Sequence, residues 1–334
     1  MIARRRILAA GALVLAMSAM AHAYLKIGFS VGNRVVSIRW NTLPIRYFVT
    51  NRDIEGVTAQ QLQGVADRAF ATWQRVPGIS LSSQFIGFTS SNPVRGDGST
   101  VIGFQARPDL DRVLGATNWV IDNTTGAVLE SDIFLNSTFA WSTAANGDPS
   151  RFDVESVTLH ELGHLLGLGH SALGETQLRA PGPGRDVLGK RAVMFPIAYP
   201  RGIVLDRTLE ADDIVGITDI YATTETERRL GSIAGKVTLN GAGVFGAHVT
   251  AFNSATQTLI GGFTLNTQGE FVISSLEPGL YVIRVEPLDD ADLDSFFDDD
   301  DNVNINFKPA YYAKLVAVPA SGTSGSIEIK VQPK

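Results

Sequence analysis

The 334-residue chain contains no cysteine, which excludes disulfide scaffolds, cysteine-ligated zinc and thiol catalysis. Positive charge is also in deficit, since 28 Lys and Arg against 34 Asp and Glu leave a formal net charge of −6. This balance argues against a nucleic-acid-binding surface, which needs a basic field. With 44% hydrophobic residues the chain is too apolar to be disordered, and its length predicts two folded units. Histidine is scarce too, so the positions of its five residues are informative.

Residues 1–23 are typical of an export signal peptide. Residues 4–6 are three arginines, an apolar run follows, and Ala21-His22-Ala23 forms a small-x-small cleavage pattern. The apolar run is too short for a stable membrane-spanning helix, although a permanent N-terminal anchor is the alternative. We therefore expect the mature chain to be secreted, extracellular or periplasmic, without a membrane attachment. The arginines also leave open the twin-arginine route.

Residues 24–226 are expected to form the first folded unit, of mixed α and β structure. Thr58, with Gln61 three residues later, predicts a capping box at the start of an amphipathic helix. A second helix is expected to start near Asp153, and a third to run from about Leu209 to Tyr221. The runs at 114–121 and 127–135 flank a polar turn and predict a hairpin.

Residues 227–334 are expected to form an all-β sandwich. The polar segment 223–229 is typical of a linker, and no helical periodicity follows it. Short strand-like runs separated by turn residues favour a sandwich. The predicted strands are 232–239, 246–252, 259–265, 270–274 and 280–285.

The chemistry is concentrated in residues 160–170, which contain three of the five histidines. On a helix, His160 and His164 would lie about 40° apart and roughly 6 Å along the axis, so that both rings share one face. A continued helix would carry His170 away from them. Gly167 can end the helix in a left-handed conformation and let the chain return to bring His170 to the same ion.

Three histidine nitrogens suit tetrahedral Zn²⁺ with a fourth position left for water. Zinc lowers the pKa of that water and polarises a carbonyl, while Glu161 can take the proton and return it to a leaving amine. The predicted reaction is peptide-bond hydrolysis. A purely structural zinc is the alternative, but it would normally have four protein ligands and no use for Glu161.

The pattern His160-Glu161-x-x-His164-x-x-Gly167-x-x-His170 resembles the metzincin signature, and Ser171 directly after it is similar to the matrixin variant. The resemblance extends to residues 69–73 and 209–221, and it implies an α+β fold with a mixed sheet and three main helices. It also implies that Met194, in Ala-Val-Met-Phe-Pro, is the Met-turn residue forming an apolar floor beneath the zinc.

The same resemblance implies where substrate binds. Pro196 and Tyr199 would line the pocket for the residue after the scissile bond. Pro196 stands where astacins and serralysins have a tyrosine ligand, so such a ligand is not expected. Gly115 and Ala116 would belong to the edge strand on which an extended peptide lies. The alternative for this segment is an ordinary hairpin in a five-stranded sheet.

Two properties of animal matrixins are not expected here. Their second zinc needs further histidines, and only His248 remains in the mature chain, in the other unit. Their latency uses a propeptide cysteine, which this chain lacks. The resemblance therefore leaves open how activity is controlled.

Residues 231–286 resemble the transthyretin-like regulatory domain found beside many carboxypeptidases, which carries no catalytic residues. The acidic stretch 289–301 follows. Asp290, Asp292 and Asp294 alternate there and can supply oxygen ligands to Ca²⁺, and a solvated acidic loop is the alternative.

Together these features predict a secreted zinc metalloendopeptidase of matrixin type that acts on protein or peptide substrates. One alternative is a secreted binding or adhesion protein in which the β-sandwich is the working part. Another is a zinc hydrolase of non-peptide bonds.

Overall fold

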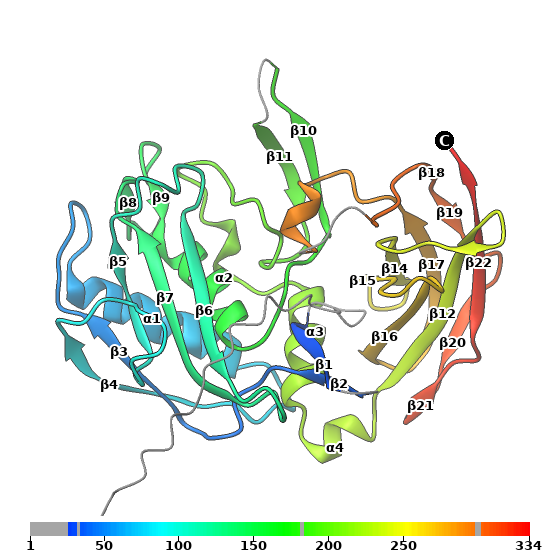
Figure 1. Ribbon diagram of the computed structural model, residues 1–334, viewed down its shortest axis with the longest axis horizontal. Helices are drawn as coiled ribbons and strands as arrows, with labels where there is room; N and C mark the ends of the chain where they lie inside the picture. The colour runs from blue at the N-terminus through cyan, green and yellow to red at the C-terminus, as the bar shows by residue number, and fades with distance from the viewer. Residues whose placement is uncertain (1–25, 32–33, 181–183, 298–301) are drawn as a thin grey trace, which may run out of the picture.

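The computed structural model describes residues 26–31, 34–180, 184–297 and 302–334. The predicted signal peptide, residues 1–23, lies outside the described residues. Among the helices of the described ranges, none has the length and apolar character needed to cross a membrane. The fold is α+β: a first part combines helices with a mixed sheet, and a second part consists of two β sheets (Figure 1).

The first part is built on a five-stranded sheet. Its strands, in spatial order, are β4 (Ser83–Thr89), β3 (Ile45–Thr50), β5 (Val101–Gln105), β7 (Val128–Asn136) and β6 (Gly115–Ile121). The first four are parallel to their neighbours, whereas β6 is antiparallel to β7. The predicted hairpin is thus confirmed, and β6 lies at the edge of the sheet.

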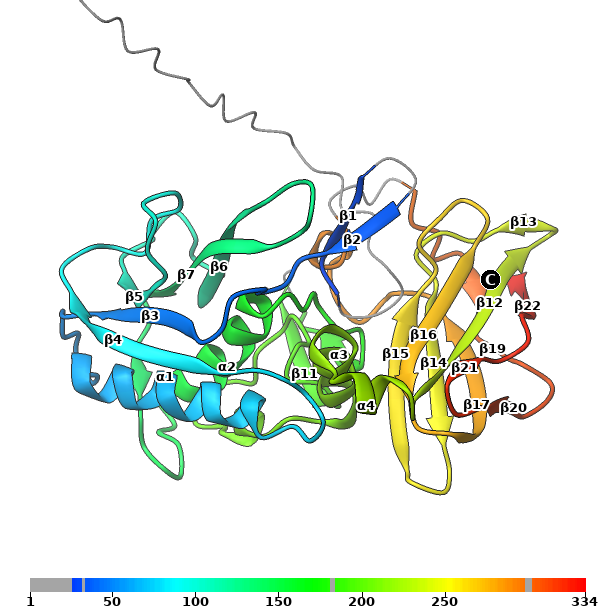
Figure 2. The ribbon, with the colours of Figure 1, turned by 90° about the horizontal axis from the view of Figure 1, so that it is seen from below.

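Two helices, α1 (Ala59–Gln74) and α2 (Val154–Leu165), cover one face of this sheet (Figure 2). The capping box that begins α1 is confirmed. The N–H of Gln61 donates to Thr58 Oγ1 at 3.2 Å, and the N–H of Thr58 donates to Gln61 Oε1 at 2.8 Å. These bonds satisfy N–H groups that otherwise have no partner at a helix start.

Several short elements complete the first part. They are the two-stranded sheets β1 (Gly28–Val31) with β2 (Arg34–Ser37), β8 (Trp141–Ser142) with β9 (Phe152–Asp153), and β10 (Gly174–Leu178) with β11 (Arg185–Lys190), and the 3-10 turn η1 (Leu205–Arg207). The β10–β11 ribbon projects from the molecule between the two parts (Figure 1).

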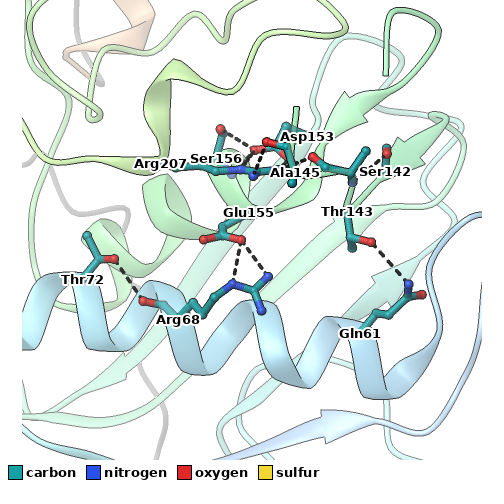
Figure 3. Close-up of polar contacts among 11 residues, drawn as sticks. Gln61, Arg68, Thr72, Ser142, Thr143, Ala145, Asp153, Glu155, Ser156 and Arg207 are labelled. Atoms are coloured by element: carbon teal, nitrogen blue, oxygen red, sulfur yellow. Dashed lines mark hydrogen bonds and ion pairs between the residues drawn. The ribbon is translucent and has the colours of Figure 1, made fainter. Parts of the chain in front are cut away.

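The start of α2 is held from two sides (Figure 3). Asp153 caps the helix, because its Oδ2 accepts from the N–H of Ser156 at 3.0 Å, and it also accepts from Nε of Arg207 at 2.9 Å. Two residues after Asp153, Glu155 accepts two hydrogen bonds from Arg68 on α1, at 2.7 and 2.9 Å. These contacts fix the helix that carries the histidine motif.

The second part contains two sheets that turn their apolar faces toward each other. The first comprises β13 (Ala242–Gly243), β12 (Gly231–Leu239), β22 (Ile327–Pro333) and β18 (Phe307–Lys308), with β16 (Glu270–Leu276) and β21 (Gly322–Thr323) also pairing with β12. The second comprises β15 (Thr258–Phe263), β14 (His248–Asn253), β17 (Gly279–Glu286) and β19 (Ala310–Tyr311), with β20 (Val316–Val318) on β17. Burial alternates along β17 and β22, as expected for strands with one buried face. Each of the five predicted strands is present.

The segment between the two parts differs from the expected linker. It forms a short helix, α4 (Thr224–Glu227), which Thr223 caps through a hydrogen bond from the N–H of Thr226 at 3.3 Å. Thr226 is itself buried. The polar residues that suggested a linker are therefore a helix cap and a packed side chain.

Helix α3 (Ala211–Tyr221) joins the two parts, since it packs against β15 and β16 (Figure 2). Asp212 on α3 is fully buried. Its carboxylate accepts from Ser171 Oγ at 2.6 Å and from the N–H of Gly261 on β15 at 2.8 Å. One carboxylate thus links the loop after the third histidine to the second part.

We predict that Asp153→Ala lowers the free energy of unfolding by roughly 3 kcal/mol, because it removes a helix cap and leaves Arg207 without its partly buried counter-charge. Glu155→Ala is the matched control. Its partner Arg68 is largely exposed, so its loss should cost below about 1 kcal/mol. Urea unfolding measures both, and equal losses would contradict this account of how α2 is held.

Candidate metal centre

Three histidine rings converge at the end of α2. His160 and His164 lie one turn apart on the helix, and His170 lies in the loop that follows. The Nε2 atom of His164 is 3.1 Å from the Nε2 atoms of both His160 and His170. Among the residues that the structure describes, these three histidines are the one group of three or more His, Asp or Glu side chains whose ligand atoms lie close enough together to hold one ion.

Gly167 makes this convergence possible, as predicted. Its φ is +102°, in the left-handed region that glycine tolerates best, and the chain reverses there. Its N–H donates to the carbonyl of His164 at 2.8 Å. A Cβ at this position would lie 2.4 Å from the carbonyl oxygen of Ile38, so a side chain is excluded.

Each ring has its Nδ1 atom against a backbone carbonyl. The three pairs are His160 with Val193, His164 with Leu168 and His170 with Ser295, at 2.8, 2.8 and 2.6 Å. Because a carbonyl can only accept, Nδ1 carries the proton in each ring and Nε2 is left with a free lone pair. All three lone pairs face one another.

This donor set fits zinc. Each ring is half-buried, and burial lowers the pKa of all three, that of His164 to about 3, so the rings are neutral at ordinary pH. Three neutral imidazoles with converging lone pairs are the ligands of a catalytic zinc site with an open position. The residues present therefore match the metal that the sequence predicts.

Glu161 lies beside the histidines and outside the converging group. Thr117 on β6 donates a hydrogen bond from Oγ1 to Glu161 Oε2 at 2.7 Å. Burial raises the pKa of Glu161 to about 7. A Cβ on Gly115 would lie 3.2 Å from Glu161 Oε1, so the edge strand runs directly against this carboxyl group.

Met194 is fully buried and packs against α2. A Cβ on Gly163, between the first two histidines, would come within 2.2 Å of Met194 Sδ. The loop is held by Asp213 of α3, whose carboxylate accepts from the N–H groups of Val193 and Met194 at 2.8 and 3.1 Å. Val193 in turn supplies the carbonyl for His160, so Asp213 acts on the site through this loop.

An open cleft of about 960 Å³ lies over the histidines. The four residues predicted for substrate binding, Gly115, Ala116, Pro196 and Tyr199, all line it. Tyr199 packs its ring against Lys190, whose Nζ lies 5.1 Å from the ring centroid.

The three aspartates proposed for calcium are not brought together as one ion-binding group in the described part of the chain. Asp290 Oδ1 accepts from the N–H of Thr176 at 2.9 Å, and Asp292 lies 3.7 Å from Arg185. Asp294 lines the cleft. The expectation of a calcium site therefore gains no support, because two of the carboxylates already have partners in the first part.

Two further residues at the site were missed by sequence reasoning. Thr117 lies two positions from Gly115 on a predicted strand, so the alternation of side chains could have placed both on one face. Ser295 had no such signal, since it acts through its backbone carbonyl.

The comparisons with known proteins agree with this geometry. Residues 39–179, which contain α1 and all three histidines, match the matrixin family. Metalloendoproteinase 1-MMP of Arabidopsis thaliana is 27% identical over 192 residues, 55% of this chain and 44% of that protein. Metalloendoproteinase 1 of Glycine max is 42% identical over 72 residues, 22% of this chain and 18% of that protein. The chain spans less than half the length of these curated relatives.

Among solved structures, OgpA from Akkermansia muciniphila is similar at 12% identity. The match covers 78% of this chain and 92% of that one, with a TM-score of 0.27.

We predict opposite effects for alanine at two helical glycines. Gly163→Ala should lower the free energy of unfolding by roughly 1–3 kcal/mol, because the added methyl overlaps Met194 Sδ. Gly64→Ala on α1 meets only an ordinary contact with Arg68 at 3.5 Å, so it should raise stability by up to about 1 kcal/mol. Urea unfolding distinguishes them, and stabilisation by both would contradict the tight packing of Met194.

Removing bound metal with a chelator should lower the melting temperature, since a ligand that binds only the folded state stabilises it. Adding back one equivalent of Zn²⁺ should restore the original value, as measured by scanning calorimetry. His248→Ala, outside the cluster, serves as a control that keeps the response. An unchanged melting temperature after complete metal removal would contradict the site.

Proposed function

Since residues 39–179 match the matrixin family, we propose that this protein is a zinc-dependent metalloendopeptidase that hydrolyses internal peptide bonds. The observation that carries the proposal is the convergence of three histidine lone pairs beside Glu161 in an open cleft. The names of the matched relatives support the same activity.

His160, His164 and His170 would hold the zinc ion. When bound, zinc supplies a Lewis acid that polarises a substrate carbonyl and lowers the pKa of a coordinated water. The protein's part is to keep the three Nε2 atoms unprotonated, which the carbonyl partners of the Nδ1 atoms do. Met194, packed against α2, would form the floor of the site.

Glu161 would be the general base and then the general acid. Its position in the cleft supports this role, as does the hydrogen bond from Thr117, which holds one carboxyl oxygen in place. A carboxylate so held can take a proton from the attacking water and deliver it to the leaving amine.

The substrate would lie as an extended peptide along β6. An edge strand has backbone N–H and C=O groups available on its outer side, and Gly115 and Ala116 of this strand line the cleft. Pro196 and Tyr199, which also line the cleft, would receive the side chain that follows the scissile bond.

The proposal extends to the rest of the chain. Residues 1–23 would be a signal peptide, residues 24–226 a metzincin catalytic domain, and residues 227–334 a regulatory-type β-sandwich. The protein would then act outside the cytoplasm. N-terminal sequencing of the exported protein tests the first boundary, which should expose Tyr24.

We predict that Glu161→Gln lowers the rate of casein hydrolysis at least 100-fold while zinc remains bound at one equivalent, because the amide cannot accept the proton. Glu225→Gln on α4, an exposed position, is the matched control and should retain full activity. Cleavage by Glu161→Gln at the wild-type rate would refute the mechanism.

Mass spectrometry of a mixed peptide library treated with the wild-type protein identifies the bond that is cut. Hydrolysis within peptides supports the proposal. Intact peptides together with hydrolysis of another class of bond would favour the non-peptide hydrolase. Binding without hydrolysis would favour the adhesion protein.

A further inference from the structure

The third histidine differs from the other two in where its hydrogen-bond partner originates. His160 and His164 pair with carbonyls of the first part, whereas His170 Nδ1 lies 2.6 Å from the carbonyl oxygen of Ser295. Ser295 ends η2 (Leu293–Ser295), a 3-10 turn of the second part drawn in orange beside β11 in Figure 1. The second part therefore reaches into the metal centre.

An apolar cluster anchors η2 on its C-terminal side. Phe297 is buried, and its ring centroid lies 5.6 Å from that of Phe263 on β15 and 5.2 Å from that of Phe245. The same cluster includes Ala172, two residues after His170. Phe297 thus ties the position of η2 to the loop that carries the third histidine.

Polar contacts hold the segment on its N-terminal side. Asp290 accepts from the N–H of Thr176 on β10 through its carboxylate, and from the Thr176 hydroxyl through its carbonyl at 2.6 Å. Arg185 on β11 donates to the carbonyl of Asp289 at 3.0 Å. The backbone is therefore held on both sides of Ser295, by β10 and β11 before it and by the apolar cluster after it.

We propose that Ser295 is a positioning residue whose backbone carbonyl sets the tautomer and orientation of His170, so that the second part completes the zinc site. This inference rests on the proposed zinc function. A histidine ligand that loses the partner of its second nitrogen typically loses 10–100-fold in metal affinity. Ser295, Phe296 and Phe297 also line the cleft, so the same segment forms one wall of the substrate site.

A backbone carbonyl cannot be removed by a side-chain substitution. The test therefore removes the side chain of Phe297, which anchors η2. In the full chain, Phe297→Ala should raise the Kd for Zn²⁺ about 10-fold or more, measured by competition with a chromophoric chelator. Phe271→Ala is the control, because Phe271 is equally buried but lies on β16, outside the cluster that holds η2. Its zinc Kd should stay within about twofold of wild type, although both variants lose stability.

A spectroscopic measurement distinguishes loss of the His170 hydrogen bond from a general loss of stability. In protein labelled with ¹⁵N-histidine, the Nδ1–H signal of His170 should show a strong hydrogen bond in wild type and in Phe271→Ala, and should lose it in Phe297→Ala. If Phe297→Ala does not fold, Phe297→Leu replaces it, with the same direction expected and a smaller change. Zinc affinity and a His170 signal that are equal in the Phe297 and Phe271 variants would overturn the inference.

Neither readout needs proteolysis, so the two proposals fail separately. A protein that loses zinc affinity selectively in Phe297→Ala but cuts no peptide would support the positioning role and refute the protease function. An active protease in which the Phe297 and Phe271 variants bind zinc equally would refute the positioning role alone.

Discussion

The structure depends on one constraint: three imidazole rings can share an ion only if each presents an unprotonated nitrogen at the same point. Backbone carbonyls meet this requirement, because each can accept only from a protonated Nδ1. The three carbonyls come from different segments, namely the loop after α2, the loop before Met194 and η2 of the second part. Much of the fold can be understood as holding these segments together.

Helix α3 is central to this arrangement, through two consecutive buried carboxylates. Asp213 holds the backbone of Val193 and Met194, and so the carbonyl that orients His160. Asp212 holds Ser171 and the strand β15 of the second part. Burial raises the pKa of Asp212 to about 7 and that of Asp213 to about 6, and several N–H and O–H donors offset this by favouring the ionised forms. Helix α3 therefore connects the loop of Val193 and Met194, and the loop that follows His170, with the sheets of the second part.

Features governed by local rules were predictable. The capping box at Thr58, the hairpin, the five strands of the second part and the reversal at Gly167 each follow from short-range patterns of residue type. The segment 223–229 contains a short capped helix between the two parts, which polar composition alone does not distinguish from an irregular linker. The expectation of calcium at Asp290, Asp292 and Asp294 gained no support for a related reason: Thr176 and Arg185, the partners of the first two carboxylates, are remote in sequence.

The sequence by itself determined the identity of the candidate ligands and of Glu161, because a helix places residues four apart on one face and glycine permits the return of His170. Only the tertiary structure decided what orients those ligands. Ser295 lies 125 residues beyond His170 and contributes a carbonyl group, which every residue possesses. A group that all residues share carries no sequence signal, so its role becomes visible only when the chain folds and brings η2 to the histidines.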